Sequence, residues 1–144
     1  MPATAFRITD LRDLDAAFTI RETVFVMGQG VPATLENDNH DRTDARHYLA
    51  RTADGMPAGA ARWRETDHGV KLERFAVLEV FRNQEIGAAL LHAVLADVQA
   101  ELPDAEVYLN AQLRAIPFYE RHGFRKEGEM FEEANIQHYK MVLE

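Results

Sequence analysis

The 144-residue sequence contains no cysteine. Disulfide bonds, thiolate metal sites and a cysteine nucleophile are therefore excluded. The sequence also has no apolar run as long as a membrane span. Its first residues, Met1 to Ala5, lack the basic and apolar regions of a signal peptide. These absences predict a cytoplasmic protein that does not associate with membranes.

Basic residues are scarce relative to acidic ones. The chain has 16 Lys and Arg against 24 Asp and Glu, which gives a formal net charge of -8. Because binding to a phosphate backbone requires clustered Lys and Arg, we expect no nucleic-acid partner. The 6 histidines are scattered without the spacing of metal ligands. The sequence therefore predicts no metal site.

An acidic segment runs from Ala33 to Arg46. Alignment with a calcium loop of the EF-hand type places Arg42 where glycine is required and Tyr48 where the bidentate glutamate is required. The segment therefore fails as a calcium site. We interpret it as a loop, or a short helix, whose acidic side chains are solvated.

The overall composition is typical of a globular protein, with 47% hydrophobic and 28% charged residues. The length fits one domain over residues 1–144 that can bury a sizeable core. No internal repeat, linker or low-complexity segment interrupts it.

The stretch from Val70 to Ala100 organises the predicted fold. Val70 to Val77 alternates charged and apolar residues before an apolar end, as a strand entering a core does. Apolar residues then recur at near-fourfold spacing from Ile86 to Val98, which predicts an amphipathic helix. A turn over Arg82 to Gly87 joins the two. Such a turn directs unpaired N–H groups and the positive end of a helix dipole at one spot, which suits a phosphate.

The remaining segments predict a mixed α/β order. A first helix begins at Leu11, with Asp10 as its N-cap, and continues towards Phe25. A short helix is expected from Ala115 to Arg121 and stops at Gly123. The other expected strands are Ala5–Ile8, His47–Ala50, Gly59–Arg64, Ala105–Asn110, Phe124–Met130 and Gln137–Leu143.

Taken together, these segments resemble the GNAT superfamily of N-acetyltransferases over essentially the whole chain. The resemblance rests on the central strand-turn-helix unit and on the segment A-I-P-F-Y-E-R-H-G-F from Ala115 to Phe124. A branch of small bacterial GNAT proteins is indicated by Val24-Phe25-Val26 with Val31-Pro32, by Leu109-Asn110-Ala111-Gln112, and by Ile136, His138 and Met141. The resemblance implies an α/β (α+β) GNAT fold. Its central sheet is mixed but mostly antiparallel, with about six to seven strands flanked by about four helices.

The resemblance also implies acetyl-CoA as cosubstrate. The pyrophosphate loop of the superfamily falls on Arg82 to Gly87, but Glu85 stands where its middle glycine is usual, and Asn83 stands where glycine is common. Glycine lets a backbone approach phosphates closely, so a carboxylate that points inward here would repel a pyrophosphate. The implied cofactor-binding residues are Phe75, Ala76, Val77, Arg82, Asn83, Gln84, Glu85, Ile86, Gly87, Ala88, Asn110 and Phe118.

Tyr119 matches the tyrosine that acts as general acid towards the CoA sulfur in many GNAT enzymes. The alternative is a helix tyrosine packed on the sheet with its hydroxyl at the surface. Glu73 has the position of an acidic residue that often serves as the base, directly or through water, and its alternative is a surface ion pair with Lys71 or Arg74. Asn110 resembles a residue that contacts the cofactor or a substrate water, or else it satisfies a turn at its strand end.

The acceptor pocket of the superfamily is built from the first helix, the following loop and the last hairpin. We expect Glu22 and His138 to contact the substrate there, and the acidic residues of these segments favour a cationic amine. His138 is expected in a structural or substrate-side role.

The predicted function is direct transfer of an acetyl group from acetyl-CoA to a primary amine of a small molecule or peptide, without a covalent enzyme intermediate. An alternative is a degenerate GNAT domain that binds acyl-CoA or a protein partner without catalysis, which Glu85 favours. A purely structural domain whose loop binds nothing is the third possibility. Homodimers are common in the superfamily, and the last strands are the expected place for pairing.

Overall fold

The computed structural model describes residues 3–144. The predicted domain over 1–144 therefore includes Met1 and Pro2, which lie outside the described residues. Seven strands form one sheet in the order β1-β2-β3-β4-β5-β7-β6. Their bounds are β1 Thr4–Arg7, β2 Arg46–Arg51, β3 Pro57–Thr66, β4 Gly69–Val77, β5 Val107–Gln112, β6 Phe124–Glu133 and β7 Ile136–Leu143.

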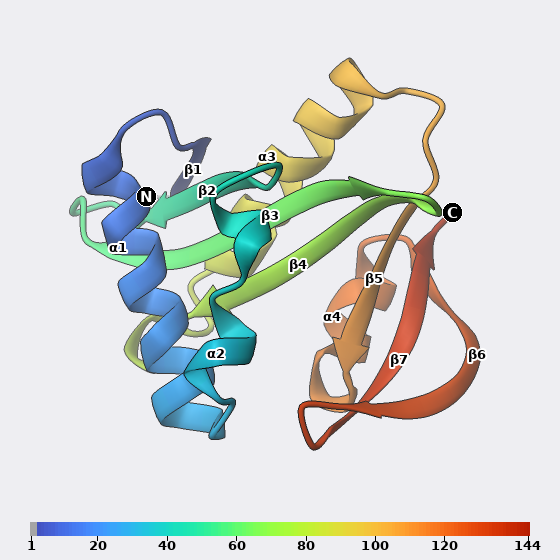
Figure 1. Ribbon diagram of the computed structural model, residues 1–144. Helices are drawn as coiled ribbons and strands as arrows, with labels where there is room; N and C mark the ends of the chain where they lie inside the picture. Colours follow the sequence, from blue (N-terminus) through green and yellow to red (C-terminus); the bar gives the residue numbers. More distant parts are fainter. Residues whose placement is uncertain (1–2) are drawn as a thin grey trace.

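Four α-helices flank this sheet (Figure 1). They are α1 Leu11–Arg21, α2 Ala33–Glu36, α3 Ile86–Glu101 and α4 Ile116–Arg121. Every strand pair is antiparallel except β4 with β5, which is parallel and is joined through α3. The predicted fold class, a mixed and mostly antiparallel sheet with flanking helices, is confirmed.

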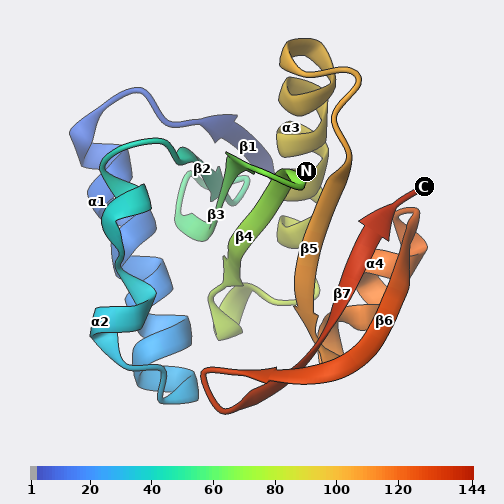
Figure 2. The same cartoon turned by 45° about the vertical axis from the view of Figure 1, so that its right-hand side comes forward.

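Strand alternation divides the core between the two faces of the sheet. Tyr48 packs in the cluster that α3 and α4 cover, whereas its neighbour Leu49 packs in the cluster that α1 covers. Ala61 and Ala60 of β3 divide in the same way. Figures 1 and 2 show α1 and α2 on one face and α3 on the other. Because side chains of a strand alternate with period 2, one apolar strand supplies both layers.

The first helix begins where the sequence predicts it. The side chain of Asp10 accepts a hydrogen bond of 2.8 Å from the backbone N–H of Asp13, which is the expected N-cap. Beyond Arg21 the helix continues as a wider π-helical segment, Glu22–Met27. Such segments are rare and occur often at functional sites, and this one borders the cleft described below.

The interpretation of the acidic segment as solvated is wrong for two of its residues. Glu36 and Asp41 are each only 5% exposed. The segment folds as the short helix α2 followed by a 3₁₀ turn over Asn39–Asp41. Both carboxylates are buried because arginines from α1 and β3 reach them. A periodicity argument cannot find this pairing, since its partners lie more than a dozen residues away in the sequence.

Candidate active site

A cleft of about 530 Å³ opens where β4 and β5 separate. Their register runs from Val70 opposite Val107 to Leu72 opposite Leu109 and ends there. β4 nevertheless continues to Val77 and β5 to Gln112, and Figure 2 shows the two strands diverging. The edge of β4 that faced β5 therefore lies free along the cleft wall. A free strand edge offers backbone N–H and C=O groups to an extended ligand.

A β-bulge in β4 lies beside this split. Ala60 pairs with Ala76, but Arg62 pairs with Glu73, so β4 carries one extra residue. Arg74 takes the left-handed conformation there, with φ of 59°. Its guanidinium donates to the backbone carbonyls of Leu35 and Glu36. The bulge thus bends β4 away from β5 and ties it to α2, as bulges beside functional sites do.

The loop before α3 has the backbone shape of a phosphate loop although it lacks the glycines. Asn83 and Glu85 have φ values of 67° and 63°, a region that glycine adopts readily and other residues rarely. The first bond into the helix runs from the N–H of Ala89 to the carbonyl of Glu85. The three preceding N–H groups, of residues 86–88, therefore have no partner within α3 and remain available to an anion.

Side chains around this loop divide between two hollows. Arg82 lines the main cleft. Asn83, Gln84, Glu85 and Ile86 border a separate hollow of about 410 Å³. Glu85 is exposed at the N-terminal end of α3 and caps no backbone group with its side chain. Its carboxylate and a phosphate would compete for the same positive end of the helix.

Tyr119 lies on α4 with its ring buried between Phe75, Phe118 and Phe124. The residue is 7% exposed and lines the cleft. Burial raises the pKa of its phenol well above 10. Its hydroxyl has no hydrogen-bond partner among the described residues, yet no fully enclosed polar side-chain atom lacks one. The hydroxyl therefore keeps some accessible surface, and the cleft is the space that its residue lines.

Glu73 lies on the cleft wall in the middle of a cluster of cations. Its carboxylate contacts Arg64 at 2.8 Å, Arg62 at 3.0 Å and Lys71 at 3.1 Å. Burial acts to raise its pKa, but the hydrogen bond from Arg64 and the surrounding positive charges outweigh burial and lower the pKa to about 2. The ion-pair alternative for Glu73 is therefore correct for Lys71, but Arg62 and Arg64 take the place expected for Arg74, and the carboxylate is buried instead of lying at the surface. A carboxylate held in this way is a weak proton acceptor.

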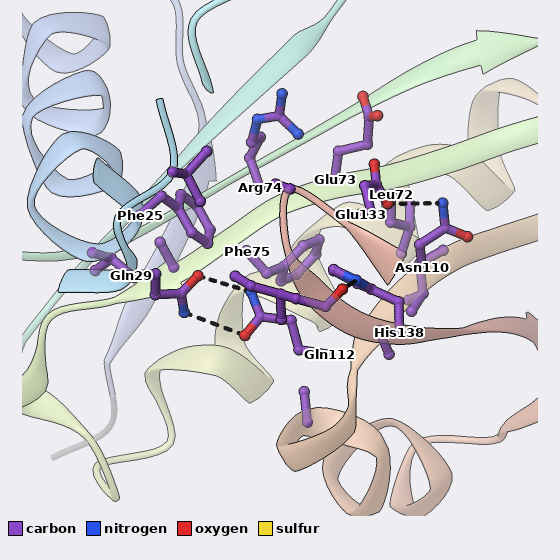
Figure 3. Close-up of a pocket in the computed structure, with 18 of the residues that line it drawn as sticks. Phe25, Gln29, Leu72, Glu73, Arg74, Phe75, Asn110, Gln112, Glu133 and His138 are labelled. Atoms are coloured by element: carbon purple, nitrogen blue, oxygen red, sulfur yellow. Dashed lines mark hydrogen bonds between the residues drawn. The ribbon is translucent and has the colours of Figure 1, made fainter. Parts of the chain in front are cut away.

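Asn110 and Gln112 extend from β5 into the cleft (Figure 3). Asn110 donates to Glu133 at 3.5 Å, a long contact across to β6. Gln112 exchanges two hydrogen bonds with Gln29, at 2.9 and 3.3 Å. Gln29 follows the π-helical segment, so this amide pair connects the two walls of the cleft (Figure 3). Sequence reasoning missed Gln29, because no local pattern relates residues 83 positions apart.

His138 also lines the cleft, from β7, and is 8% exposed. Its ring stacks on Phe131 of β6 with centroids 5.8 Å apart. Its Nδ1 lies 2.7 Å from the carbonyl oxygen of Ile136. His138 therefore lies in the cleft, and its contact with the acceptor stays a prediction. Glu22, the other residue predicted there, is exposed on the π-helical segment and does not line the cleft.

A buried ion-pair network lies next to the cleft, and its member Glu36 lines it. Arg21 of α1 donates to Glu36 at 2.6 Å and to Asp41 at 2.7 Å. Arg62 of β3 donates to Asp41 at 2.7 Å and to Asp38 at 2.8 Å. The argument for a cationic acceptor rested on Glu22, Glu36, Asp38 and Asp41. Arginines of the same fold pair with the last three, so only the exposed Glu22 still supports it.

The predicted cofactor-binding residues divide by position. Those that line the cleft are Phe75, Ala76, Val77, Arg82 and Asn110. Gly87 and Ala88 lie in the first turn of α3 without lining it. Phe118 packs against Gly87, where an added Cβ would lie 3.4 Å from the ring. Within residues 3–144, no three His, Asp or Glu side chains are arranged to hold a metal ion. In the same range, no helix is long and apolar enough to cross a membrane.

Residues 15–144 match the family model of the acetyltransferase (GNAT) domain. The chain belongs to the GNAT acetyltransferase family. Among GNAT relatives, the uncharacterized N-acetyltransferase YjcF of Bacillus subtilis is 38% identical over 130 residues, which cover 90% of this chain and 91% of YjcF. Protein ElaA of Escherichia coli is 34% identical over 134 residues, which cover 91% of this chain and 87% of ElaA.

Solved GNAT structures agree with the fold. The crystal structure of Escherichia coli ElaA superposes with a TM-score of 0.83 at 28% identity and covers 99% of this chain and 98% of that one. An acyl-CoA N-acyltransferase from Pseudomonas aeruginosa gives the same TM-score, identity and coverage. The split of β4 from β5 and the loop before α3 therefore belong to a GNAT domain.

Proposed function

We propose that this GNAT domain binds acetyl-CoA and transfers the acetyl group directly to a primary amine of a small molecule or peptide. The observation that carries the proposal is the hydroxyl of Tyr119, which has no hydrogen-bond partner within residues 3–144 and whose residue lines the cleft between β4 and β5. A hydroxyl in such a place is able to donate a proton to a group held in the cleft. The absence of cysteine agrees with direct transfer, because no thiol is available for a cysteinyl intermediate.

The residues present fit an extended ligand that ends in phosphates. The free edge of β4 over Phe75–Val77 offers backbone groups to the amide-bearing chain of the cofactor. The unpartnered N–H groups of residues 86–88, together with Arg82, offer donors to the phosphates. Phe118 and Gly87 keep the start of α3 close to α4. Asn110 adds an amide to the opposite wall.

Bound acetyl-CoA supplies the reactive thioester carbonyl. The protein then has to favour a neutral amine and to protonate the departing sulfur. A free thiol has a pKa of about 8.5 and a phenol a pKa of about 10, so the phenol of Tyr119 is protonated at rest. Burial raises the pKa of Tyr119 further, which keeps it protonated but makes it a weaker acid. Proton transfer from Tyr119 therefore accompanies cleavage of the C–S bond and does not precede it.

One observation favours the non-catalytic alternative. Glu85 presents a carboxylate at the helix end that the phosphates would occupy. If this carboxylate repels the phosphates, acyl-CoA binds weakly or not at all, and no amine causes the release of CoA. The two functions differ in a measurable product, since only a transferase generates free CoA thiol.

Calorimetric titration with acetyl-CoA tests the first part. We expect binding that Arg82→Ala weakens by about tenfold or more, because a charge-assisted contact contributes roughly 1.5–3 kcal/mol. Arg125→Ala is the matched control, since Arg125 is an exposed arginine of β6 outside the cleft. Absence of binding heat in the wild type would contradict the proposal.

A panel of amines with a thiol-reactive chromophore tests the second part. The protein contributes no background, because it has no cysteine and every reacting thiol is CoA. Putrescine, L-lysine, glucosamine and a lysine-containing peptide cover cationic, zwitterionic, sugar and peptide amines. Release of CoA above the rate without amine supports transfer. Binding of acetyl-CoA without release for any amine supports the non-catalytic alternative.

A further inference from the structure

The tautomer of His138 is fixed by its neighbour. Its Nδ1 lies 2.7 Å from the carbonyl oxygen of Ile136, and a carbonyl oxygen is only able to accept. Nδ1 therefore carries the proton and donates it. In the neutral ring this leaves Nε2 as the nitrogen with a lone pair. The stacked ring of Phe131 holds the imidazole plane in place.

Nε2 of His138 has no hydrogen-bond partner among the described residues, although the residue is only 8% exposed. Among residues 3–144, every fully enclosed polar side-chain atom has a hydrogen-bond partner. Nε2 therefore retains accessible surface, and His138 lines the cleft, where Figure 3 shows its ring among the side chains of the site. An imidazole with one nitrogen committed to a donor bond and the other open to a ligand site has the usual arrangement of a general base.

We propose that Nε2 of His138 is the proton acceptor of the transfer reaction and removes the proton that the attacking amine nitrogen must lose. This inference rests on the proposed acetyl transfer. It differs from the sequence expectation in two respects. It gives His138 a catalytic role in place of a contact with the substrate, and it moves the base from Glu73 on β4 to the last hairpin.

The other carboxylates of the cleft are poorly suited to the task. Glu73 contacts three cations, and Glu36 contacts Arg21 at 2.6 Å. A carboxylate in such a pair gives up favourable charge interactions when it accepts a proton. Glu133 is exposed at the end of β6 and receives the amide of Asn110. Glu133 is therefore the alternative that the experiment has to separate from His138.

The proton balance is complete without a further reactant. The N–C bond forms as the C–S bond breaks. An ammonium nitrogen loses two protons: His138 takes the first before attack and passes it to solvent, and it takes the second as the amide forms, while Tyr119 gives one proton to sulfur. His138 then returns its proton to solvent and Tyr119 recovers one from solvent. For an amine that arrives as ammonium, the net products are the N-acetyl amine, CoA thiol and one proton.

Other charged groups share the cleft with His138. Gln112, opposite it on β5, is neutral, and so is Phe131 on β6. The titratable or charged groups that line the same cleft are Glu133 from β6, Tyr119 from α4, Arg114 from the turn before α4, Glu36 from α2, Lys71, Glu73 and Arg74 from β4, and Arg82 from the loop before α3. Variants of Glu133 therefore accompany every pH profile below.

The test compares His138→Asn with His122→Asn. Asparagine keeps a short donor for the Ile136 carbonyl but has no group at the position of Nε2. His122 is the matched control, because its Nδ1 makes the same kind of bond, 2.9 Å to the carbonyl of Phe118, outside the cleft. The readouts are the acetyl-CoA dissociation constant, kcat and KM with the best amine of the panel, and the pH profile from 6 to 10. Glu133→Gln is measured in parallel.

We expect His138→Asn to lower kcat by about 100-fold at neutral pH with little change in acetyl-CoA affinity. The deficit narrows as the pH approaches the pKa of the free amine, because the amine then arrives neutral. His122→Asn retains the wild-type rate. The proposal is overturned if Glu133→Gln lowers kcat while His138→Asn keeps the wild-type kcat. It is also overturned if His138→Asn raises KM and leaves kcat unchanged.

An independent readout needs no turnover. Long-range ¹H–¹⁵N NMR of the folded protein is expected to show His138 protonated at Nδ1 and unprotonated at Nε2 near neutral pH. Protonation at Nε2 alone overturns the role of His138 while acetyl transfer stands. A wild type that binds acetyl-CoA but acetylates no amine removes both the proposed function and its base.

Discussion

Two residues of the loop before α3 hold a backbone conformation that glycine adopts with less strain. Asn83 and Glu85 are left-handed at φ of 67° and 63°. Asparagine tolerates this region, whereas a residue such as glutamate is disfavoured there by roughly 1–2 kcal/mol. The loop therefore keeps a shape suited to phosphate while its sequence has lost the residue that usually permits it. Packing of Ile86, which is 2% exposed, against β3 holds that shape.

We expect Glu85→Gly to raise the free energy of unfolding by about 0.5–1 kcal/mol, because it relieves the left-handed strain. It also removes a carboxylate from the helix end, so acetyl-CoA affinity rises. Urea unfolding and calorimetry measure the two effects. Glu85→Gln separates them, since it is expected to improve affinity without stabilising the fold. Glu79→Gly is the control, because Glu79 has no positive φ and gains nothing from glycine.

Tyr119 is the residue whose hydroxyl the proposed chemistry uses. We expect Tyr119→Phe to lower kcat by about 100-fold, with acetyl-CoA affinity unchanged. Stability changes by less than about 0.5 kcal/mol, because the lost hydroxyl has no hydrogen-bond partner in the part of the chain that the structure describes. Steady-state kinetics and urea unfolding provide the measurements. Tyr139→Phe on β7 outside the cleft serves as control. Equal rates for both variants would show that the phenol of Tyr119 supplies no proton.

At the scale of elements, the ion-pair network joins four segments near the cleft: α1, the 3₁₀ turn over Asn39–Asp41, β3 and β4. Arg21 of α1 and Arg62 of β3 share the carboxylate of Asp41, and Glu73 of β4 reaches Arg62 from the other side. Breaking a buried pair by removing one partner leaves an uncompensated charge. The network therefore fixes the distance between α1 and the split strands.

We expect Asp41→Asn to lower the free energy of unfolding by about 3–5 kcal/mol, because both arginines lose their shared anion. Chemical denaturation measures the change. Asp44→Asn is the matched control, since Asp44 is exposed and its side chain contacts the side chains of His40 and Thr43 at the surface. Its expected effect stays within about 0.5 kcal/mol. A similar loss in both variants would mean that the buried network contributes no more than a surface pair.

The network also predicts how stability depends on pH. Burial acts against the charged form, but arginines and Lys71 lower the folded pKa of Glu73 from 4.5 to about 2. The pKa of Asp41 is lowered as well. Because the unfolded chain binds these protons at a higher pH, the contribution of these carboxylates to stability is full above about pH 4.5 and is lost as the pH drops towards 2. Burial lowers the pKa of His47, so protonation of the unfolded chain below 6.5 acts in the same direction. Urea midpoints at pH 7, 4.5 and 3 measure this loss, and a midpoint that is constant over this range would contradict it.

At the scale of the molecule, the exposed edge of the sheet is β6, whose residues are mostly exposed. Met130 on this strand is 45% exposed. If the last strands pair as predicted for a homodimer, sedimentation equilibrium gives twice the chain mass of 16.4 kDa. Met130→Asp then shifts the equilibrium towards the monomer, because it buries a charge in the pairing surface. A wild-type monomer at high micromolar concentration would rule out pairing at this edge.

The sequence by itself determined the elements and the family. Alternation and fourfold spacing located the strands and α3, Asp10 located the start of α1, and local motifs such as Arg82 to Gly87 and the segment around Tyr119 located the loop and α4. Such features are local, because each depends on residues within a few positions of one another. Local patterns also sufficed to identify a GNAT domain.

Only the tertiary structure decided which charges are free to act. It paired Glu36 and Asp41 with arginines from distant elements, surrounded Glu73 with three cations, and left Nε2 of His138 open to the cleft. It also brought Gln29 to Gln112 across the cleft. Charge compensation depends on distance in space and on burial, and neither can be read from spacing along a chain. For that reason the sequence was enough to identify the family, whereas our proposal for the base depends on contacts that only the fold creates.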